Sequence, residues 1–475
     1  LVFYEDADNT GTFSNVDNLD DANLNVKSTA IRGTVATFDY NDSAQSYVVA
    51  NDFGTIDMDE TTVGDEWNSG EALVVTLKDQ DLNKNTLSDE DLTMATSDLI
   101  PSLQIGSPIM TKVMSGTNST GTSTVDNIAN TTLLKFSNIH TVGTVSSSTG
   151  DLTTGSLQIN TANIVSTLRT AATASATGTI YTFINYDVTS LVGALTAVGV
   201  YDSSNQLGFD AITPTGTTTR GFYQLENIVT DANGFTDTEH IRVNFTGTPD
   251  IAAGDRFYVD FFTFGDGTET SDRVNNAIYR LELEETGDNT AEFVGEVEYI
   301  MLNQLNADLA STFAGITPIS DEIVIIVHED LTDEDSPRIN YNDKGADGVV
   351  TQIADQVAAP SHSGVVSFDS DNYKTADTVV VTLDDQDMNV DSDLIDVYIV
   401  KSDNKVGNGG SDHLLDITFD DSTWTALNAT TFSLVETGTD TGIFVGSFQI
   451  PSGQTGKDIE VNYNDHRDAS GETIE

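Results

Sequence analysis

The sequence predicts an all-β protein made of tandem β-sandwich modules, one of which carries a long β-rich insertion. Runs rich in β-branched and aromatic residues are typical of strands, and two clear examples are residues 257–262 and 323–327. Turn clusters such as residues 231–234 and 265–267 separate such runs at the spacing of a sandwich. Long helical periodicity is hard to find, and residues 302–313 are the best short candidate for a helix.

Three short motifs recur along the chain, which indicates repeated modules. The first, which we call the DQDxN motif, is a Val-Val-Thr-Leu strand followed by Asp-Gln-Asp-x-Asn, at residues 74–83 and 380–389. The second, the ETG motif, runs from a glutamate to a phenylalanine at residues 5–13, 285–293 and 436–444. The third, the YND motif, is the tripeptide Tyr-Asn-Asp at residues 40–42, 341–343 and 463–465.

The order of the motifs defines the expected modules. Each full module reads DQDxN, then ETG, then YND, and about 40 residues separate a YND motif from the next DQDxN motif in both cases. We therefore expect the C-terminal part of an Ig-like module at residues 1–50 and full Ig-like modules at 51–345 and 346–475. The first full module is much the longer, so we expect a Thr-rich β domain inserted at about residues 100–255. The chain should thus begin partway through one module and end at the close of another.

Charge is the strongest compositional feature. The chain has 19 Lys and Arg against 76 Asp and Glu, a formal net charge of −57 at pH 7. Such a protein repels nucleic-acid phosphates and anionic membrane surfaces, and it gathers cations around itself. Self-repulsion also opposes the compact state, so we expect counter-ions to support the fold. The excess is either a solvated surface suited to high salt or a device for binding cations.

Other features of the sequence narrow the functional class. Cysteine is absent, which excludes disulfide scaffolds, thiolate metal sites and cysteine nucleophiles. No apolar run approaches the length of a membrane-spanning helix, so no direct membrane span is expected in this chain. The six histidines are scattered without ligand-type spacing, and nucleophile-elbow, phosphate-loop and dinucleotide-binding motifs are missing. We therefore expect a protein that is not an enzyme.

The DQDxN motifs place oxygen side chains at alternate positions, which resembles the first half of an EF-hand loop and favours calcium. The glycine of a true EF-hand is replaced by Lys84 and Val390, so an EF-hand proper is not expected. The alternative reading is an acidic β-turn held by Asx hydrogen bonds. The predicted Ca²⁺ ligands of the loops, with a closing carboxylate each, are Asp79, Asp81, Asn83, Asn85, Glu90, Asp385, Asp387, Asn389, Asp391, Asp393 and Asp396.

Further carboxylates recur at equivalent places in the other two motifs. They are candidate ligands for calcium sites between modules, of the kind that stiffen cadherin-like arrays, or they simply end strands and form turns. These candidates are Glu5, Glu285, Glu436, Asp42, Asp343 and Asp465. The sequence also contains five Asn-x-Ser/Thr sites that would accept N-glycans on an exported protein, at Asn41, Asn118, Asn130, Asn244 and Asn428.

The inserted segment differs from the rest of the chain in composition. Between residues 101 and 200 there are few charges, and Thr, Ser, Ala, Gly and Asn dominate. This is either an ordinary β domain with a Thr-rich exposed face or a surface through which copies of an acidic protein can touch without repulsion.

In combination, the motifs resemble the large surface-layer (S-layer) proteins of ammonia-oxidising archaea. The resemblance rests on the acidic β-module array, the VVTLxDQDxN and ETGxxTGxFxG elements and the V-x-YND endings, and it is clearest at residues 1–95 and 257–468. It implies Ig-like modules, export to the cell surface, self-assembly into a porous two-dimensional lattice, dependence on divalent cations and N-glycosylation. It supplies no catalytic residues.

Charge and resemblance together lead to a functional hypothesis. A lattice whose pores are lined by carboxylates would act as a cation exchanger, enriching small cations, including ammonium, and excluding anions. The expected partners are other copies of the chain and small cations, and nucleic acid is not expected. Two alternatives stay open: a cadherin-like calcium-binding adhesin array, and the non-catalytic portion of a secreted enzyme from a salty habitat.

Overall fold

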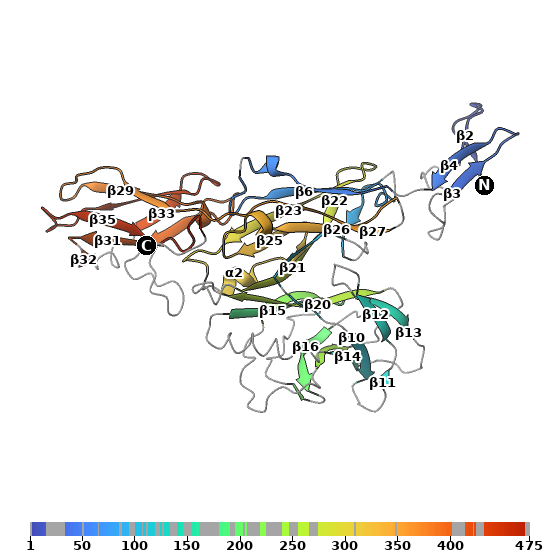
Figure 1. The fold of residues 1–475 in the computed structure, drawn as a ribbon, viewed down its shortest axis with the longest axis horizontal. Helices are drawn as coiled ribbons and strands as arrows, with labels where there is room; N and C mark the ends of the chain where they lie inside the picture. The colour runs from blue at the N-terminus through green and yellow to red at the C-terminus, as the bar shows by residue number, and fades with distance from the viewer. Residues whose placement is uncertain are drawn as a thin grey trace.

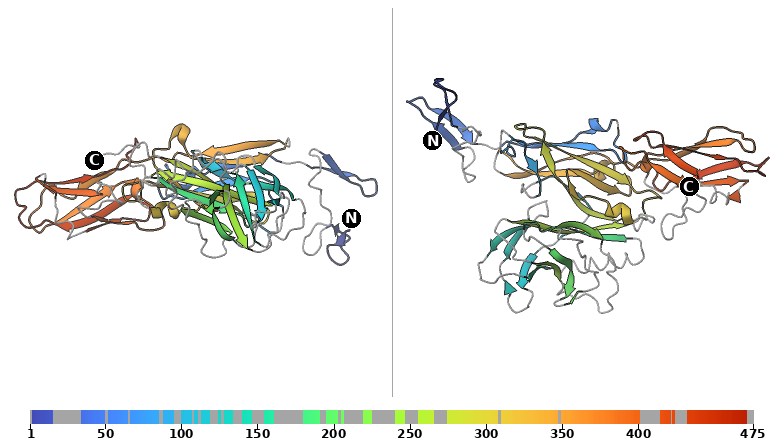
Figure 2. Two further views of the ribbon diagram at one scale, coloured as in Figure 1. Left: turned by 90° about the horizontal axis from the view of Figure 1, so that it is seen from below. Right: turned by 180° about the vertical axis from the view of Figure 1, so that it is seen from behind.

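The computed structural model is elongated, with two β-hairpins at its N-terminal end, a central module, and a C-terminal module at the opposite end (Figures 1 and 2). A further β domain projects from one side of the central module. The structure describes residues 2–15, 34–49, 52–64, 66–84, 88–94, 100–106, 108–110, 113–118, 124–125, 128–133, 140–145, 154–160, 180–190, 195–202, 205–206, 219–224, 240–246, 255–265, 274–307, 310–346, 349–400, 414–420, 422–423 and 432–470.

Strands make up nearly all of the regular structure, and they form several separate, mainly antiparallel sheets. The predicted all-β class of sandwich modules is therefore confirmed, whereas Ig-like topology stays a prediction. The helical segments of the described residues are short: η1 (Glu60–Thr62), α2 (Ala310–Ala314), η3 (Asp333–Asp335) and η4 (Gln386–Met388). The predicted helix at residues 302–313 is thus limited to α2.

The central module is a sandwich of two sheets. In the first, the strand order is β5 (Thr55–Met58), β6 (Leu73–Lys78), β23 (Glu292–Met301), β22 (Leu283–Glu285) and β7 (Asp91–Leu92), and β25 (Glu322–Val327) pairs with β23 in parallel. In the second, β8 (Ser102–Ile105) lies between β21 (Asn275–Leu281) and β26 (Arg338–Lys344), with β27 (Val350–Gln356) outside β26 and β24 (Ile319–Ser320) beside β21.

Side-chain alternation builds the core of this sandwich. Leu73, Val75 and Leu77 of β6 are fully buried, while the residues between them are half-buried, as the period-two pattern of a strand requires. They pack with residues of the second sheet, including Leu103 and Ile339, in one continuous apolar cluster.

The C-terminal module repeats this arrangement. One sheet has the order β28 (Val365–Phe368), β29 (Thr378–Asp384), β34 (Ile443–Gln449), β33 (Phe432–Glu436) and β30 (Val397–Val400), and the other has β31 (Leu415–Phe419) between β32 (Ser422–Thr423) and β35 (Ile459–Tyr463). The register is also repeated: Leu77 of β6 lies opposite Phe293, and Leu383 of β29 lies opposite Phe444. Both phenylalanines are fully buried.

The insertion leaves the central module at the end of β8 and returns at β21, two strands that pair with each other. In the C-terminal module, the strands that correspond to β8 and β21 are β31 and β32, and only residues 420–421 separate them in the sequence. The inserted strands are β9 (Ile109–Met110), β10 (Val113–Asn118), β11 (Thr124–Val125), β12 (Ile128–Leu133), β13 (His140–Val145), β14 (Thr154–Asn160), β15 (Ile180–Asp187), β16 (Leu195–Asp202), β17 (Asn205–Gln206), β18 (Arg220–Gln224), β19 (His240–Thr246) and β20 (Arg256–Gly265). Strand β20 lies beyond the expected boundary near residue 255.

A buried ion pair ties the insertion to the central module. Arg280 of β21 contacts Asp260 of β20 at 2.7 Å, with both side chains almost fully buried. The Arg280 guanidinium also lies 4.4 Å from the centre of the Tyr258 ring, in cation–π geometry. The apolar clusters of the two domains are continuous at this point, because Phe262 and Phe264 of β20 belong to the core of the central module.

The described residues 2–15 and 34–49 form two separate hairpins. Strands β1 (Tyr4–Glu5) and β2 (Phe13–Ser14) make one, and β3 (Thr34–Phe38) and β4 (Gln45–Val49) make the other. The first YND motif lies in the turn between β3 and β4, where Asn41 and Asp42 both adopt positive φ angles, as residues at the centre of a type I′ turn do.

Candidate functional site at the repeated acidic loops

The first aspartate of each DQDxN motif is buried at one end of its module. Asp79 accepts a hydrogen bond from the Asp81 amide at 2.9 Å and another from the Tyr341 hydroxyl at 2.9 Å. Asp385 accepts the equivalent bonds from the Asp387 amide, at 2.9 Å, and from the Tyr463 hydroxyl. The bond to the amide two residues on is an Asx turn. We call residues 79–84 the first acidic loop and residues 385–393 the second acidic loop.

The third residue of each YND motif lies beside the same loop. Asp343 accepts a hydrogen bond from the Gly54 amide at 3.1 Å, and Asp465 accepts one from the Gly364 amide at 2.8 Å. A Cβ atom at Gly364 would lie 2.8 Å from a carboxylate oxygen of Asp385, so the chain enters the module in direct contact with the loop. The fold therefore brings the DQDxN and YND motifs together.

The glutamate of each ETG motif holds its own turn. Glu285 accepts hydrogen bonds from the Ala291 amide at 2.7 Å and the Thr290 amide at 3.0 Å, and its other oxygen accepts one from the Glu90 amide at 3.1 Å. Glu436 makes the equivalent bonds to the amides of Thr441, Gly442 and Asp396.

Glu90 and Asp396, predicted as closing ligands, also bond to backbone. Glu90 accepts a hydrogen bond from the Lys84 amide at 3.2 Å, and Asp396 accepts one from the Val390 amide at 2.8 Å. These bonds fix the far end of each acidic loop to the strand that follows it. Asn83 and Asn389 donate across to the ETG turn, to Asn289 at 2.8 Å and to Asp440 at 3.0 Å.

The remaining predicted site residues are not gathered in this way. Glu5 accepts a hydrogen bond from the Gly11 amide at 2.9 Å in an exposed turn, and Asp42 is exposed at the tip of its hairpin. Asn85 lies outside the described residues. Of the predicted glycosylation sites, Asn41 is exposed at the same tip, and Asn428 lies outside the described residues. Asn118 lies in β10, Asn130 in β12 and Asn244 in β19, and the side chains of these three residues are outside the described part of the structure.

These contacts bear on the calcium prediction. Within the described ranges, no group of three or more His, Asp or Glu side chains is arranged to hold a metal ion. Both carboxylate oxygens of Asp79 and of Asp385 accept hydrogen bonds from the protein, so an ion would have to share or replace those bonds. The described contacts are those of the alternative reading, an acidic turn with Asx hydrogen bonds. Calcium binding stays a prediction.

The second acidic loop differs from the first because the preceding module packs against it. Ser69 of the central module donates to the carbonyl of Asn389 at 2.7 Å, and Asn303 donates to the carbonyl of Asp387 at 3.1 Å. In the reverse direction, the Ser392 amide donates to the Gly70 carbonyl at 3.1 Å. Side chains and backbone of both modules thus form a continuous network.

Basic residues complete this junction. Arg467 is 1% exposed, and its Nε donates to the carbonyl of His328 at 2.6 Å. His362, in the linker, contacts Asp387 through its amide at 2.9 Å and through Nδ1 at 3.0 Å. Its other ring nitrogen lies 3.8 Å from Glu66 of the central module. Arg467 is thus one of only 19 Lys and Arg residues in the chain, and it is buried where two acidic modules meet.

Burial perturbs the carboxylates of the junction. Desolvation, together with the nearby charges of Asp387 and Asp468, raises the pKa of Asp465 to about 7. Desolvation and the Asp387 charge likewise raise the pKa of Asp385 well above its ordinary value. On the central module, desolvation and the charges of Asp391 and Asp393 raise the pKa of Glu298 to about 7. The junction therefore contains carboxyl groups that bind protons near neutral pH.

The sequence interpretation missed the residues that join the modules: Ser69, Gly70, Asn303, Gln304, His328, His362 and Arg467. One signal was present, because Arg467 follows a YND motif in a chain where basic residues are rare. A comparison of the repeats does not point to Arg467, because the equivalent position of the central module is occupied by Gly345.

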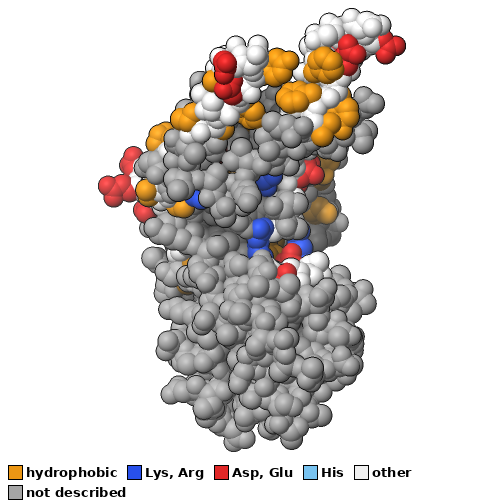
Figure 3. Space-filling view, turned by 90° about the vertical axis from the view of Figure 1, so that its right-hand side faces the viewer, with side chains coloured by type: hydrophobic (Ala, Val, Ile, Leu, Met, Phe, Trp, Pro, Cys, Tyr) orange, Lys and Arg blue, Asp and Glu red, His pale blue; other side chains and the backbone are white. Residues whose placement is uncertain are grey.

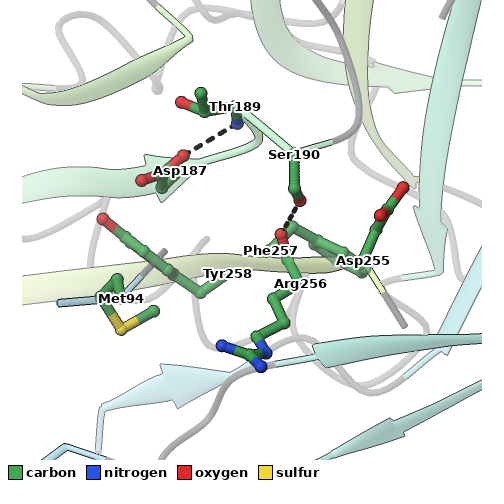
Figure 4. A pocket seen from close by; sticks show the side chains of 8 residues that line it. All are labelled: Met94, Asp187, Thr189, Ser190, Asp255, Arg256, Phe257 and Tyr258. Carbon is green, nitrogen blue, oxygen red and sulfur yellow. Dashed lines mark hydrogen bonds between the residues drawn. The ribbon is translucent and has the colours of Figure 1, made fainter. Parts of the chain in front are cut away.

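A small cavity lies in the insertion, on the side that faces the central module (Figure 4). It has a volume of about 270 Å³ and is lined by residues that include Met94, Asp187, Arg256 and Tyr258. Asp187 already accepts the Thr189 amide at 2.8 Å, and Ser190 donates to the carbonyl of Arg256. The cavity is remote in sequence from the repeated motifs, and its hydrogen bonds serve the local backbone.

Comparison with known proteins finds no matching family model, and no curated protein matches the chain in sequence. Among the described residues, no helix has the length and apolar character needed to cross a membrane.

Proposed function

We propose that this protein is a structural component of a cell surface, an S-layer protein that assembles with copies of itself into a porous two-dimensional lattice. The observation that carries the proposal is a net charge of −57 on β-sandwich modules joined end to end by a buried network. A lattice subunit must keep its shape over a long distance, and it must present a defined surface to the medium that flows through it.

The junction supports the mechanical part of the proposal. The contacts of Ser69, Asn303 and Arg467 cross between the modules and are buried, so breaking them would leave polar groups without partners. The insertion is held just as firmly through the Arg280–Asp260 pair. The central module, its insertion and the C-terminal module therefore behave as one stiff body of irregular outline, which is suited to tiling around pores.

Charge supports the filtering part. Acidic side chains also border a surface cavity of about 450 Å³ on the central module. Its lining includes Glu329, Glu334 and Asp335, together with Arg338. Fixed negative charge raises the local concentration of cations and lowers that of anions. A pore between such subunits would enrich small cations, ammonium among them, as a cation-exchange resin does.

Assembly requires surfaces that do not repel. Residues 101–200 carry few charges, and we propose that this part of the insertion makes lattice contacts. Divalent cations such as Ca²⁺ are proposed to assist by neutralising carboxylates where modules or subunits meet. At the junction, desolvation raises the pKa of Glu298 and the charges of Asp391 and Asp393 add to the shift, so cations that screen these charges would favour docking.

A cadherin-like calcium-binding adhesin array is the second candidate. It is favoured by one observation, namely that the second acidic loop lies at a boundary between modules. An adhesin would remain monomeric with calcium and would bind a ligand on another surface, whereas a lattice protein would bind its own copies.

Negative-stain microscopy of the purified protein, with calcium titrated in and then chelated, tests the proposal. Ordered sheets that form with calcium and disperse with chelator support the lattice and its dependence on divalent cations. Sheets that survive chelation support the lattice alone. Dispersed rods under both conditions contradict the lattice and leave the adhesin candidate.

Cation enrichment is tested separately on assembled sheets. Equilibrium dialysis should show ammonium enriched within the layer at low ionic strength, with the enrichment lost when carboxylates are protonated or salt is raised. An ammonium partition that does not change at low pH contradicts a role for fixed charge.

A further inference from the structure

Large hydrophobic side chains are concentrated on the surface of the N-terminal hairpins. Figure 3 shows them at this end of the molecule, next to acidic side chains. The exposed hydrophobic residues of the hairpins include Phe3 (54%), Tyr4 (47%), Phe13 (57%), Val35 (54%), Phe38 (40%), Tyr40 (86%) and Tyr47 (62%). Exposed aromatic residues gathered in this way mark an interaction surface.

The β1–β2 hairpin has the same local structure as its counterparts in the two complete modules. Glu5 lies opposite Phe13, just as the glutamate and phenylalanine of the other ETG motifs pair, Glu285 with Phe293 and Glu436 with Phe444. The glutamate accepts the turn amide in all three copies, that of Gly11 in the first. Gly11 also shares the positive φ angle of its counterparts, Ala291 and Gly442.

The three copies differ in what lies next to the phenylalanine. In the complete modules, β6 or β29 pairs with the strand that carries it, and Leu77 or Leu383 lies opposite the ring. Phe293 and Phe444 are therefore fully buried, whereas Phe13 is 57% exposed. In the described part of the chain, β2 pairs only with β1.

We infer that β2 is an acceptor for a strand of the DQDxN type, which adds to it in antiparallel orientation. The complete modules define the register: the leucine of the incoming strand lies opposite Phe13. They also define the backbone contact that follows the strand, since the amides of Asp79 and Asp385 donate to the carbonyls of Ala291 and Gly442 at 3.0 and 2.9 Å. The equivalent acceptor on this surface is the carbonyl of Gly11. Addition of a strand to an open edge is a common mode of peptide recognition.

The occupant is a free strand of this type rather than the folded strand of a second copy. In every copy, β6 is already paired on both sides, with β5 and β23, and β29 is paired with β28 and β34. A second copy could offer either strand only by unfolding a module core. A free strand of the same sequence type meets the hairpin at no such cost.

The inference is tested with a fluorescent peptide of residues 72–83 added to the 475-residue protein. Fluorescence anisotropy should show saturable binding. The variant Phe13→Asp should weaken the binding by at least about tenfold, because burial of the ring is lost. The matched control Leu394→Asp changes an equally exposed apolar residue (62%) of the C-terminal module and should leave the binding unchanged. A peptide carrying Leu77→Asp should bind the unaltered protein as weakly as the unaltered peptide binds the Phe13→Asp variant.

Register is tested by disulfide trapping, which is clean because the chain has no native cysteine. Ser14 corresponds to Val294, which lies opposite Thr76. The variant Ser14→Cys should therefore crosslink to a peptide with Thr76→Cys faster than to one with Val75→Cys.

Three results would overturn the inference. The first is a peptide that does not bind, and the second is trapping at equal rates by both peptide positions. The third is a dimer that the protein forms without peptide, that Phe13→Asp abolishes and that added peptide does not dissociate. In that case a second copy of the chain would be the occupant of the hairpin surface.

Discussion

The two acidic loops have nearly the same sequence and the same internal hydrogen bonds, yet in the described part of the chain only the second packs against a neighbouring module. In the first acidic loop, Asp81 and Asn83 are half-buried, whereas Asp387 and Asn389 of the second are 2% and 0% exposed. The internal bonds must therefore stabilise each module, because they are present with or without a neighbour. The contacts found only in the second acidic loop are the ones that couple modules.

The comparison indicates that the repeated carboxylates act mainly as hydrogen-bond acceptors for the backbone. A row of alternating acidic residues invites a metal interpretation, but here the repeated oxygens accept amide protons that would otherwise be buried without partners. Asp385 and Asp465, whose pKa values are raised mainly by desolvation, lie at the second loop. The first loop is thus a natural internal control for experiments on the second.

The largest difference is expected for removal of equivalent aspartates. Asp387→Ala deletes the contacts to His362 and leaves the Arg467 side chain buried without that neighbouring charge, so it should lower the free energy of unfolding of the C-terminal module by about 3 kcal/mol. Asp81→Ala should cost about 1 kcal/mol or less in the central module, because that site is partly hydrated. Urea unfolding followed by hydrogen exchange of each module measures both. Equal losses would mean that docking adds nothing to the role of this residue.

Two glycines provide a finer test of the interface. Both Gly64 and Gly70 have positive φ angles, but a Cβ at Gly64 meets open space, whereas one at Gly70 would lie 3.0 Å from backbone atoms of Val390 and Asp391. Gly64→Ala should cost about 1 kcal/mol from backbone strain alone. Gly70→Ala should cost about 1 kcal/mol more and should speed exchange of the Ser392 amide, which donates to Gly70. If the Ser392 amide stays equally protected in both variants, the modules are not tightly docked at this point.

The sequence predicted those parts of the fold that depend on local pattern. The Val-Val-Thr-Leu run of the DQDxN motif indicated a strand, and the matched motifs indicated two copies of one module, because strand preference and turn chemistry are encoded over a few residues. The far boundary of the insertion was harder to place, since the apolar run of β20 reads the same whether it belongs to the insertion or to the module.

The candidate site was predicted only in part, for a physical reason. The sequence singled out Asp79 and Asp385 as calcium ligands, but carboxylates at alternate residues suit either an ion or an Asx turn, and sequence spacing alone cannot separate the two. The junction residues escaped because they do not repeat. Arg467 reaches the carbonyl of His328, more than a hundred residues away in the chain, and a contact of that kind follows from docking rather than from any local pattern.

The last expected effect is on the pH dependence of stability, and it isolates the titration of one buried carboxyl group. Because the pKa of Asp465 is raised from 3.8 to about 7, the folded protein binds a proton that the unfolded chain releases between these pH values. The stabilisation from this group is complete below about pH 4 and is lost as the pH rises through 7, so the C-terminal module should be more stable at pH 5.5 than at pH 8. Asp465→Asn should flatten this slope, since it keeps an acceptor for the Gly364 amide and removes the titration. Asp343→Asn removes the same charge from the equivalent site and should leave the slope of the C-terminal module unchanged, which separates local titration from the self-repulsion of the whole chain. Urea midpoints of the C-terminal module across this pH range measure the effect, and parallel slopes in the two variants would assign the pH dependence to net charge alone.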